Sequence, residues 1–151
     1  MIILHANGKK VEFPALRLSK HRKDFYWGLY CTNDYEQAKR WAIHQKPSPT
    51  INYYTYIKDP SIKIIKFEDM TYEWLDFIAN CRAGGRHDYD IVEGPIASDR
   101  VRDFVELYLN DKISKKAFLE IAKLPYKTHQ MSFHTTKALH CLRFEKSEVL
   151  T

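Results

Sequence analysis

The sequence predicts an α+β fold, and three observations support that class. Short runs of β-branched and aromatic residues are typical of strands, and they recur along the whole chain. Amphipathic segments that begin at capping residues and end at proline or glycine are typical of helices. The two kinds of segment do not alternate regularly, as they would in a protein built from successive βαβ units. We therefore expect strands in mixed order with helices inserted between them.

The expected strands are short and rich in β-branched or aromatic residues. They cover residues 2–5, 28–32, 52–57, 62–67, 89–93, 130–134 and 142–144. Their number and brevity favour small sheets over a single long one.

The first two expected helices have recognisable starts and ends. Asn33 is followed three residues later by Glu36, the pattern of an N-cap with a capping-box partner, and the helix over 33–45 ends before Pro47. Apolar residues at helical spacing predict a second helix over 71–82, which a glycine pair follows. We expect the second helix to pack against a sheet.

Three further helices are expected in the second half of the chain. Ser98 is the expected cap of a helix whose apolar residues repeat at helical spacing as far as Tyr108. Ser114 is the expected cap of the next helix, which reaches Leu124 before a proline. A short fifth helix is expected over 135–142.

Length and composition indicate a single globular domain over residues 1–151. Hydrophobic residues make up 44% of the chain, which is enough for a substantial core. The net charge of +5 comes largely from a basic patch that contains Arg17, Lys20, Arg22 and Lys23. Such a patch is typical either of a solvated loop or of a site that attracts anions.

The sequence favours a cytoplasmic protein that has no membrane span and no metal site. No apolar stretch approaches the roughly 18 residues that cross a bilayer, and the first residues lack the charge order of a secretory signal. Cys31, Cys81 and Cys141 form no C-x-x-C pair, so we expect reduced thiols in the core. The 7 histidines show no ligand spacing with these cysteines, and we expect no metal site.

Generic catalytic motifs are absent, so the informative signal is a set of polar residues in apolar settings. The chain has no phosphate-binding glycine loop, no H-E-x-x-H and no G-x-S-x-G. His5 ends the first strand, and Tyr30 follows Gly28 on the same strand face. Gln130 and Ser132 share one face of a later strand. Taken singly, each of these positions is typical of a structural residue.

Taken together, five segments resemble a known family. The segment DFYWGLYCTNDYEQAKRW over 24–41 resembles the block DFGxGFYLTxDxxQAxxWA of small prokaryotic proteins in a domain-of-unknown-function family related to the ADP-ribosyltransferases. Four more segments resemble motifs of that family, namely LHAN, YEWLDFIANCR, DYDIVEGPIASDRV and HQMSFHTTKAL. Five motifs in the same order are more specific than any one of them.

The resemblance implies an ADP-ribosyltransferase-like fold, in which two small β-sheets form an NAD cleft with flanking helices. It places His5, Tyr30 and Gln130 at three signature positions, where the first and third hold ribose hydroxyls and the tyrosine stacks on nicotinamide. Positive charge develops on the sugar as the bond from C1′ to nicotinamide breaks, so positioning and electrostatics would carry most of the catalysis. The NAD-binding residues that the resemblance implies are His5, Ala6, Asn7, Arg17, Phe25, Gly28, Tyr30 and Ser132.

The resemblance implies a polar or acidic residue at the third signature position, and Gln130 is a neutral residue there. A neutral amide can orient a ribose but cannot act as a base or offset a cation, so Gln130→Glu is expected to preserve activity or raise hydrolysis of NAD. Arginine is not the expected acceptor, because the E-x-E arrangement of arginine-modifying members is absent. Glu93 is the candidate for a compensating carboxylate, although a glutamate at a strand end is more often solvated.

The expected function is NAD-dependent transfer of ADP-ribose to a macromolecule, in a toxin with a small neutralising protein encoded beside it. Nucleic acid is slightly favoured over protein as the acceptor, because Tyr26 and Trp27 beside the basic patch offer stacking surfaces. Three alternatives stay open. They are an RNA 2′-phosphotransferase-like reaction, NAD glycohydrolase activity on the same fold, and a non-catalytic module that binds NAD or nucleic acid.

Overall fold

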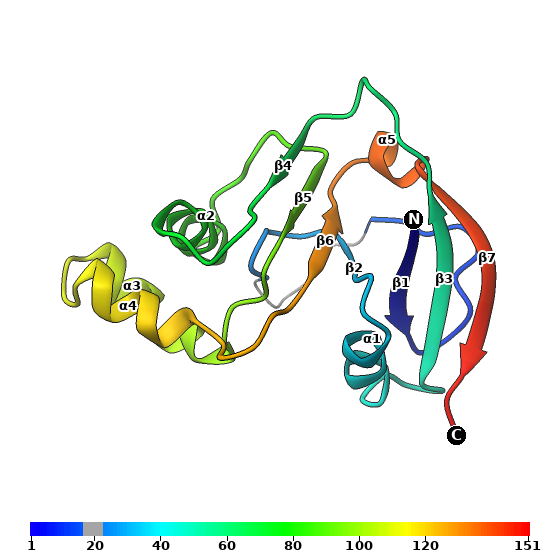
Figure 1. Cartoon of the computed structure of the whole chain (residues 1–151), viewed down its shortest axis with the longest axis horizontal. Helices are drawn as coiled ribbons and strands as arrows, with labels where there is room; N and C mark the ends of the chain where they lie inside the picture. Colours follow the sequence, from blue (N-terminus) through cyan, green and yellow to red (C-terminus); the bar gives the residue numbers. More distant parts are fainter. Residues whose placement is uncertain (17–22) are drawn as a thin grey trace.

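The α+β architecture consists of two small open sheets and several helices (Figure 1). The computed structural model describes residues 1–16 and 23–151. One sheet has three antiparallel strands in the order β1-β3-β7. They are β1 (Ile2–Asn7), β3 (Thr50–Tyr56) and β7 (Leu142–Val149).

The second sheet has four strands in the order β2-β6-β5-β4, and only the β4–β5 pair is parallel. Its strands are β2 (Leu29–Cys31), β6 (Gln130–Phe133), β5 (Ile91–Gly94) and β4 (Ile64–Lys66). The register sets Tyr30 opposite Ser132 and Gly94 opposite Gln130. Since side chains alternate along a strand, Tyr30, Ser132 and Gln130 share one face of this sheet.

In the part of the chain that the structure describes, the two sheets meet at a single β-bridge between Leu4 of β1 and Thr32, the residue that follows β2. Leu4 N–H donates to the Thr32 carbonyl at 2.8 Å, and Thr32 N–H donates to the Leu4 carbonyl at 2.9 Å. One residue further along β1, the His5 side chain bonds to the Tyr30 carbonyl instead. Backbone hydrogen bonds therefore link the edges of the two sheets at Leu4, and a side-chain hydrogen bond links them at the next residue, His5.

Helix α1 (Tyr35–Ala42) packs on the three-stranded sheet, where its small residues Ala38 and Ala42 contact Leu4 and Ile51. Its N-cap is Asp34, whose side chain accepts from Glu36 N–H at 3.0 Å. The expected cap, Asn33, is wrong by one residue: the helix begins one residue later, and the side chain that accepts from its first turn is that of Asp34.

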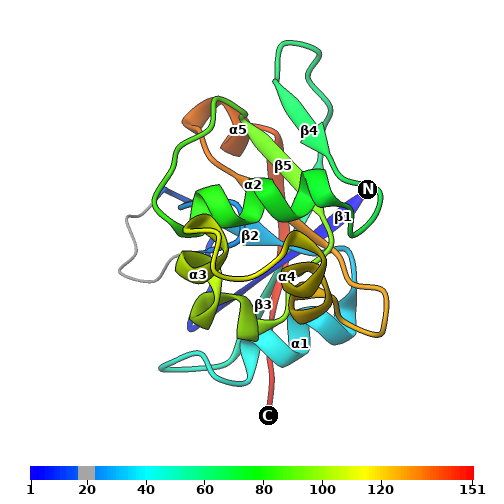
Figure 2. The same ribbon diagram turned by 90° about the vertical axis from the view of Figure 1, so that its left-hand side faces the viewer.

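Helix α2 (Tyr72–Arg82) lies across the four-stranded sheet (Figure 2), as expected. It begins at Thr71, whose hydroxyl accepts from Trp74 N–H, and buries Trp74, Leu75 and Ile78 against Phe25 and Val92. This apolar cluster gives α2 its stability, since isolated helices of this length are marginal in water.

The helix expected from Ser98 is two separate pieces. A 3₁₀ helix, η1 (Asp99–Asp103), ends at Phe104, where φ is −122°, and α3 (Val105–Leu109) follows. The remaining helices, α4 (Lys115–Ala122) and α5 (Thr136–Leu139), begin at the side-chain caps Ser114 and Thr135. No helix in the described part of the chain is long and apolar enough to span a membrane.

A second apolar cluster joins the two sheets. It combines Ile3 and Tyr54 of the three-stranded sheet with Leu29, Met131 and Phe133 of the other. All three cysteines are buried and unpaired, as predicted. The β7 strand runs five residues past the expected end at residue 144. The sequence did not predict this extension, because the outer half of the strand is largely exposed and lacks an apolar pattern.

Candidate functional site

A cavity of about 440 Å³ lies at the β2 edge of the four-stranded sheet, and the three predicted signature residues line it together. We call it the His5 cavity. β1 contributes His5, β2 contributes Tyr30 and β6 contributes Gln130. Residues far apart in sequence therefore meet in one concave site. Their assignment to NAD chemistry stays a prediction.

His5 is held as a neutral imidazole. Its Nδ1 lies 2.9 Å from the Tyr30 carbonyl oxygen, which can only accept, so Nδ1 carries the proton. Its Nε2 is then an acceptor and receives a long contact of 3.4 Å from the Asn7 amide. Burial lowers the pKa of His5. The ring thus offers the cavity an acceptor at neutral pH.

Tyr30 forms an aromatic wall whose hydroxyl is fixed by the preceding loop. The hydroxyl donates to the Tyr26 carbonyl at 2.6 Å and accepts from Phe25 N–H at 2.9 Å. Burial raises the pKa of Tyr30 well above its usual range, and the Asp24 charge adds to this. Tyr26 itself has φ of 78°, a conformation that costs energy for a bulky residue. The loop therefore carries strain at the point where it positions Tyr30.

The Gln130 amide has a fixed orientation. Its Nε2 donates to Asp24 Oδ2 at 2.9 Å and to the Pro95 carbonyl at 3.1 Å, and the residue is 4% exposed. Both partners can only accept, so the amide cannot be reversed. No described residue donates to its Oε1. That oxygen is the polar end that Gln130 can offer to a ligand.

Asp24 is the central buried charge of the site, and the sequence did not reveal it. Its Oδ1 accepts from Arg82 Nε at 2.9 Å and from Arg82 Nη2 at 2.6 Å. Its Oδ2 accepts from Ala97 N–H at 2.9 Å as well as from Gln130. Because these partners lie between 58 and 106 residues away, no local pattern predicts the network.

Helix α1 and the described end of the basic patch complete the His5 cavity. Arg40 and Trp41 line it from α1. Lys23 also lines it, and its Nζ lies 5.7 Å from the centroid of the Tyr30 ring. The cavity therefore has two aromatic residues and two cations as well as Arg82.

The other predicted NAD-binding residues are divided between cavity and core. Ala6 and Gly28 line the His5 cavity, and Asn7 contacts His5 beside it. Phe25 is fully buried in the core, and Ser132 is fully buried on β6, where its hydroxyl donates to the Val92 carbonyl of β5. These last two positions reach the cavity only through their neighbours. Arg17 lies outside the described residues.

Glu93 lies on the opposite face of the sheet from Gln130. It pairs across the strands with Met131, and its Oε2 accepts from His129 Nε2 at 2.7 Å. This hydrogen bond lowers the pKa of Glu93. Glu93 lines a separate hollow and is not part of the His5 cavity. The buried carboxylate beside Gln130 is Asp24 instead.

The His5 cavity can hold a planar ring next to a polar, hydroxyl-rich group. Tyr30 and Trp41 supply aromatic surfaces, while His5 Nε2 and Gln130 Oε1 supply acceptors. A family model described as "Protein of unknown function (DUF3990)" matches residues 1–144. No curated protein and no solved structure matches the chain.

Proposed function

The chain belongs to the DUF3990 family, and we propose that it is an NAD-dependent ADP-ribosyltransferase whose reaction takes place in the His5 cavity. The observation that carries this proposal is the meeting of His5, Tyr30 and Gln130 around one cavity. We also assign the two-sheet architecture to the ADP-ribosyltransferase-like fold. A cytoplasmic role as a toxin that a small protein neutralises belongs to the same proposal.

Each wall of the cavity suits one part of NAD. The Tyr30 and Trp41 rings offer surfaces on which nicotinamide stacks. The His5 Nε2 atom accepts from a ribose hydroxyl, since its existing contact with Asn7 is long and weak. Lys23 and Arg40 supply positive charge for the pyrophosphate.

Gln130 contributes orientation and a partial negative charge. Because Asp24 and Pro95 hold the amide nitrogen, the carbonyl oxygen Oε1 accepts from a ribose hydroxyl near the breaking C1′–nicotinamide bond. The amide dipole then favours the positive charge that develops on the sugar. Asp24 adds a full negative charge behind the amide, which Arg82 largely offsets. This arrangement stabilises the transition state less than a free glutamate would, and it limits wasteful hydrolysis of NAD.

The acceptor is proposed to be a macromolecule, with nucleic acid favoured over protein because cations line the cavity. An RNA 2′-phosphotransferase-like reaction, NAD hydrolysis and simple binding of NAD or nucleic acid are outcomes that the same experiment distinguishes. Labelled NAD is incubated with the protein and a cell lysate, and the products are treated with nuclease or protease. Label that nuclease releases identifies a nucleic-acid acceptor.

Two variants test whether the His5 cavity is the site. Gln130→Ala removes the proposed ribose acceptor and should lower NAD turnover at least tenfold. Glu93→Gln is the control, because Glu93 lies on the opposite face of the sheet and should leave turnover unchanged. The proposal is rejected if millimolar NAD does not raise the melting temperature, since a ligand at 100 times its Kd adds about 2.7 kcal/mol to the folded state.

A further inference from the structure

A second cavity of about 450 Å³ shares Gly28 with the His5 cavity. We call it the Trp27 cavity. Five ring residues line it, namely Tyr26, Trp27, His87, Tyr89 and His134. A Cβ atom at Gly28 would lie 2.7 Å from the Phe133 carbonyl and 2.8 Å from His134 Nδ1, so only glycine fits between the two cavities.

The two histidines of the Trp27 cavity have no ring nitrogen left for chemistry. His134 Nδ1 donates to the Trp27 carbonyl at 2.7 Å, and its Nε2 faces Ser132 Oγ at 2.6 Å. His87 Nε2 donates to the Phe25 carbonyl at 2.9 Å, and its Nδ1 accepts from Tyr89 N–H at 3.1 Å. Burial lowers the pKa of both rings.

These contacts decide what the histidines can offer a ligand. Neither ring can bind a metal or relay a proton without breaking a hydrogen bond that fixes it. The rings meet edge to face with centroids 4.4 Å apart. They act as neutral, rigid aromatic walls.

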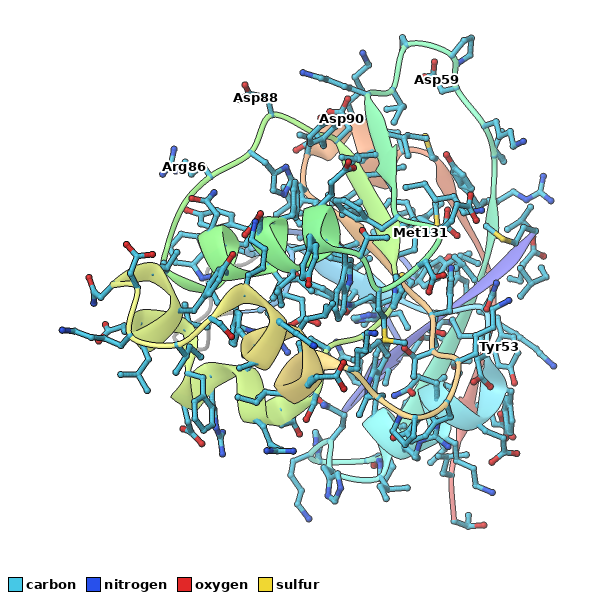
Figure 3. The ribbon with its side chains drawn as sticks, turned by 60° about the vertical axis from the view of Figure 1, so that its left-hand side comes forward. Tyr53, Asp59, Arg86, Asp88, Asp90 and Met131 are labelled. Carbon is cyan, nitrogen blue, oxygen red and sulfur yellow. The ribbon has the colours of Figure 1, made fainter. Side chains whose placement is uncertain are left out.

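The positively charged side chain of Arg86 lies at the edge of this aromatic site. Arg86 is exposed on the loop between α2 and β5, which also carries Asp88 (Figure 3). Its Nε donates to the Tyr26 hydroxyl at 3.2 Å. No other described residue bonds to its guanidinium, so the two terminal nitrogens remain for an anion.

We propose that the Trp27 cavity binds one nucleotide of a single-stranded nucleic acid, with the base on the aromatic rings and a phosphate on Arg86. Aromatic stacking with an adjacent cation is how proteins hold single strands. An aromatic side chain of a protein partner would use the rings but would bring no anion for Arg86. Nucleic acid would then be the acceptor of the proposed ADP-ribose transfer, and this part of the inference rests on the proposed function. Binding of the single strand itself requires no NAD.

The test is titration of labelled single-stranded DNA and RNA oligonucleotides without NAD, followed by fluorescence anisotropy. Trp27→Ala should weaken binding about tenfold or more, because a stacked base is lost. Arg86→Ala should weaken binding and reduce the slope of log affinity against log salt by about one. Tyr126→Ala and Arg102→Ala are the matched controls and should bind as the wild type does, since both residues lie outside the Trp27 cavity.

Two further measurements separate this inference from the proposed function. Trp27→Phe keeps a ring and should retain most of the affinity, which distinguishes lost stacking from lost folding. The NAD-dependent shift in melting temperature should be the same in Trp27→Ala and the wild type. Equal oligonucleotide affinity in the wild type and Trp27→Ala overturns the inference and leaves the NAD reaction standing.

Competition between NAD and the oligonucleotide, with loss of the NAD shift in Trp27→Ala, also overturns the inference. It would assign the Trp27 cavity to the adenosine half of NAD. Oligonucleotide binding without any effect of NAD would support the base site and reject the proposed function.

Discussion

At the scale of single residues, the Asp24 carboxylate determines what Gln130 can do. It accepts four hydrogen bonds from Arg82, Ala97 and Gln130, and its side chain is 4% exposed. A buried carboxylate with this many donors fixes the direction of each of them. The amide of Gln130 consequently presents its oxygen and never its nitrogen.

These contacts reverse the expectation that Gln130→Glu preserves activity. The new carboxylate would lie where an amide nitrogen now sits 2.9 Å from Asp24 and 3.1 Å from the Pro95 carbonyl. Two acceptors would then face a third, so we expect the variant to lose about 2–3 kcal/mol of stability at pH 7 together with its NAD turnover. Denaturant unfolding and turnover assays measure the two effects.

The pH dependence of the Gln130→Glu stability loss and a second substitution at Asp24 test whether repulsion between the two carboxylates causes that loss. Like charge raises the pKa of the introduced glutamate above its unfolded value, so the deficit should shrink as the pH falls and the group binds a proton. In Asp24→Asn/Gln130→Glu the asparagine amide can donate to the glutamate. The double variant should therefore lose less free energy of unfolding than the two single variants lose in sum. A Gln130→Glu protein as stable as the wild type at pH 7 would show that the amide is not held as described.

The candidate site was only partly predictable at this scale. His5, Tyr30 and Gln130 could be selected because they occur in motifs that resemble a known family, and they do line one cavity. Asp24 and Trp41 lie at the two ends of the matched segment 24–41, but the resemblance assigns neither of them a role in the site. The partners of Asp24 come from distant segments, and the spacing of Trp41 fits an ordinary apolar helix face. The resemblance assigned Phe25 to NAD binding, and its side chain is fully buried in the core, because an aromatic residue next to a site and one beneath it look alike in sequence.

At the scale of elements, α1 links the three-stranded sheet to the His5 cavity. Its alanines pack on β1 and β3, while Arg40 and Trp41 line the cavity. The helix spans only Tyr35–Ala42, so its first turn contributes a large share of its stability. Loss of the N-cap should therefore destabilise the helix that positions Trp41 in the cavity.

The N-cap prediction compares two neighbouring residues. Asp34→Ala should lower the free energy of unfolding by about 1 kcal/mol, because the acceptor for Glu36 N–H is lost. Asn33→Ala should have almost no effect, since the side chain of Asn33 is exposed and its backbone bond to His129 remains. Urea unfolding of both variants measures the difference. Equal losses would contradict the assignment of Asp34 as the cap.

Element types were easier to predict than their ends. Strands and helices were placed correctly where apolar periodicity is strong, as in α2 and β6. The break at Phe104 was not predicted, because Val101 and Val105 are both buried and keep a helical spacing across it. The division of the strands into two sheets depends on contacts between distant segments, which periodicity does not contain. Only the family resemblance implied it.

At the scale of the whole molecule, three neutral histidines are built into the fold. Burial lowers the pKa of His5, His87 and His134, the last to about 4. The unfolded chain, with histidine pKa values near 6.5, therefore binds protons more readily than the folded chain as the pH falls. These residues stabilise the fold above about pH 6.5, and that contribution is lost toward pH 4.

The stability of the wild type should accordingly fall by at least about 2 kcal/mol between pH 7.5 and pH 4.5. The lowered pKa of Glu93 adds a loss only below its ordinary value of 4.5, so it does not produce the change in this range. His134→Gln should give a flatter profile, because it removes a group whose pKa is lowered to about 4 in the folded protein. Chemical unfolding at a series of pH values provides the test. A flat profile for the wild type would mean that the imidazoles titrate normally.

The three buried thiols give the molecule internal reporters of its own opening. Cys31 and Cys141 lie in the cluster between the sheets, whereas Cys81 lies on α2. Burial raises the pKa of all three thiols, so a labelling reagent reaches a reactive thiolate only after the surrounding element has moved away. Separation of the two sheets would expose Cys31, and detachment of α2 would expose Cys81. The order in which the cysteines are alkylated therefore records which half of the protein opens first.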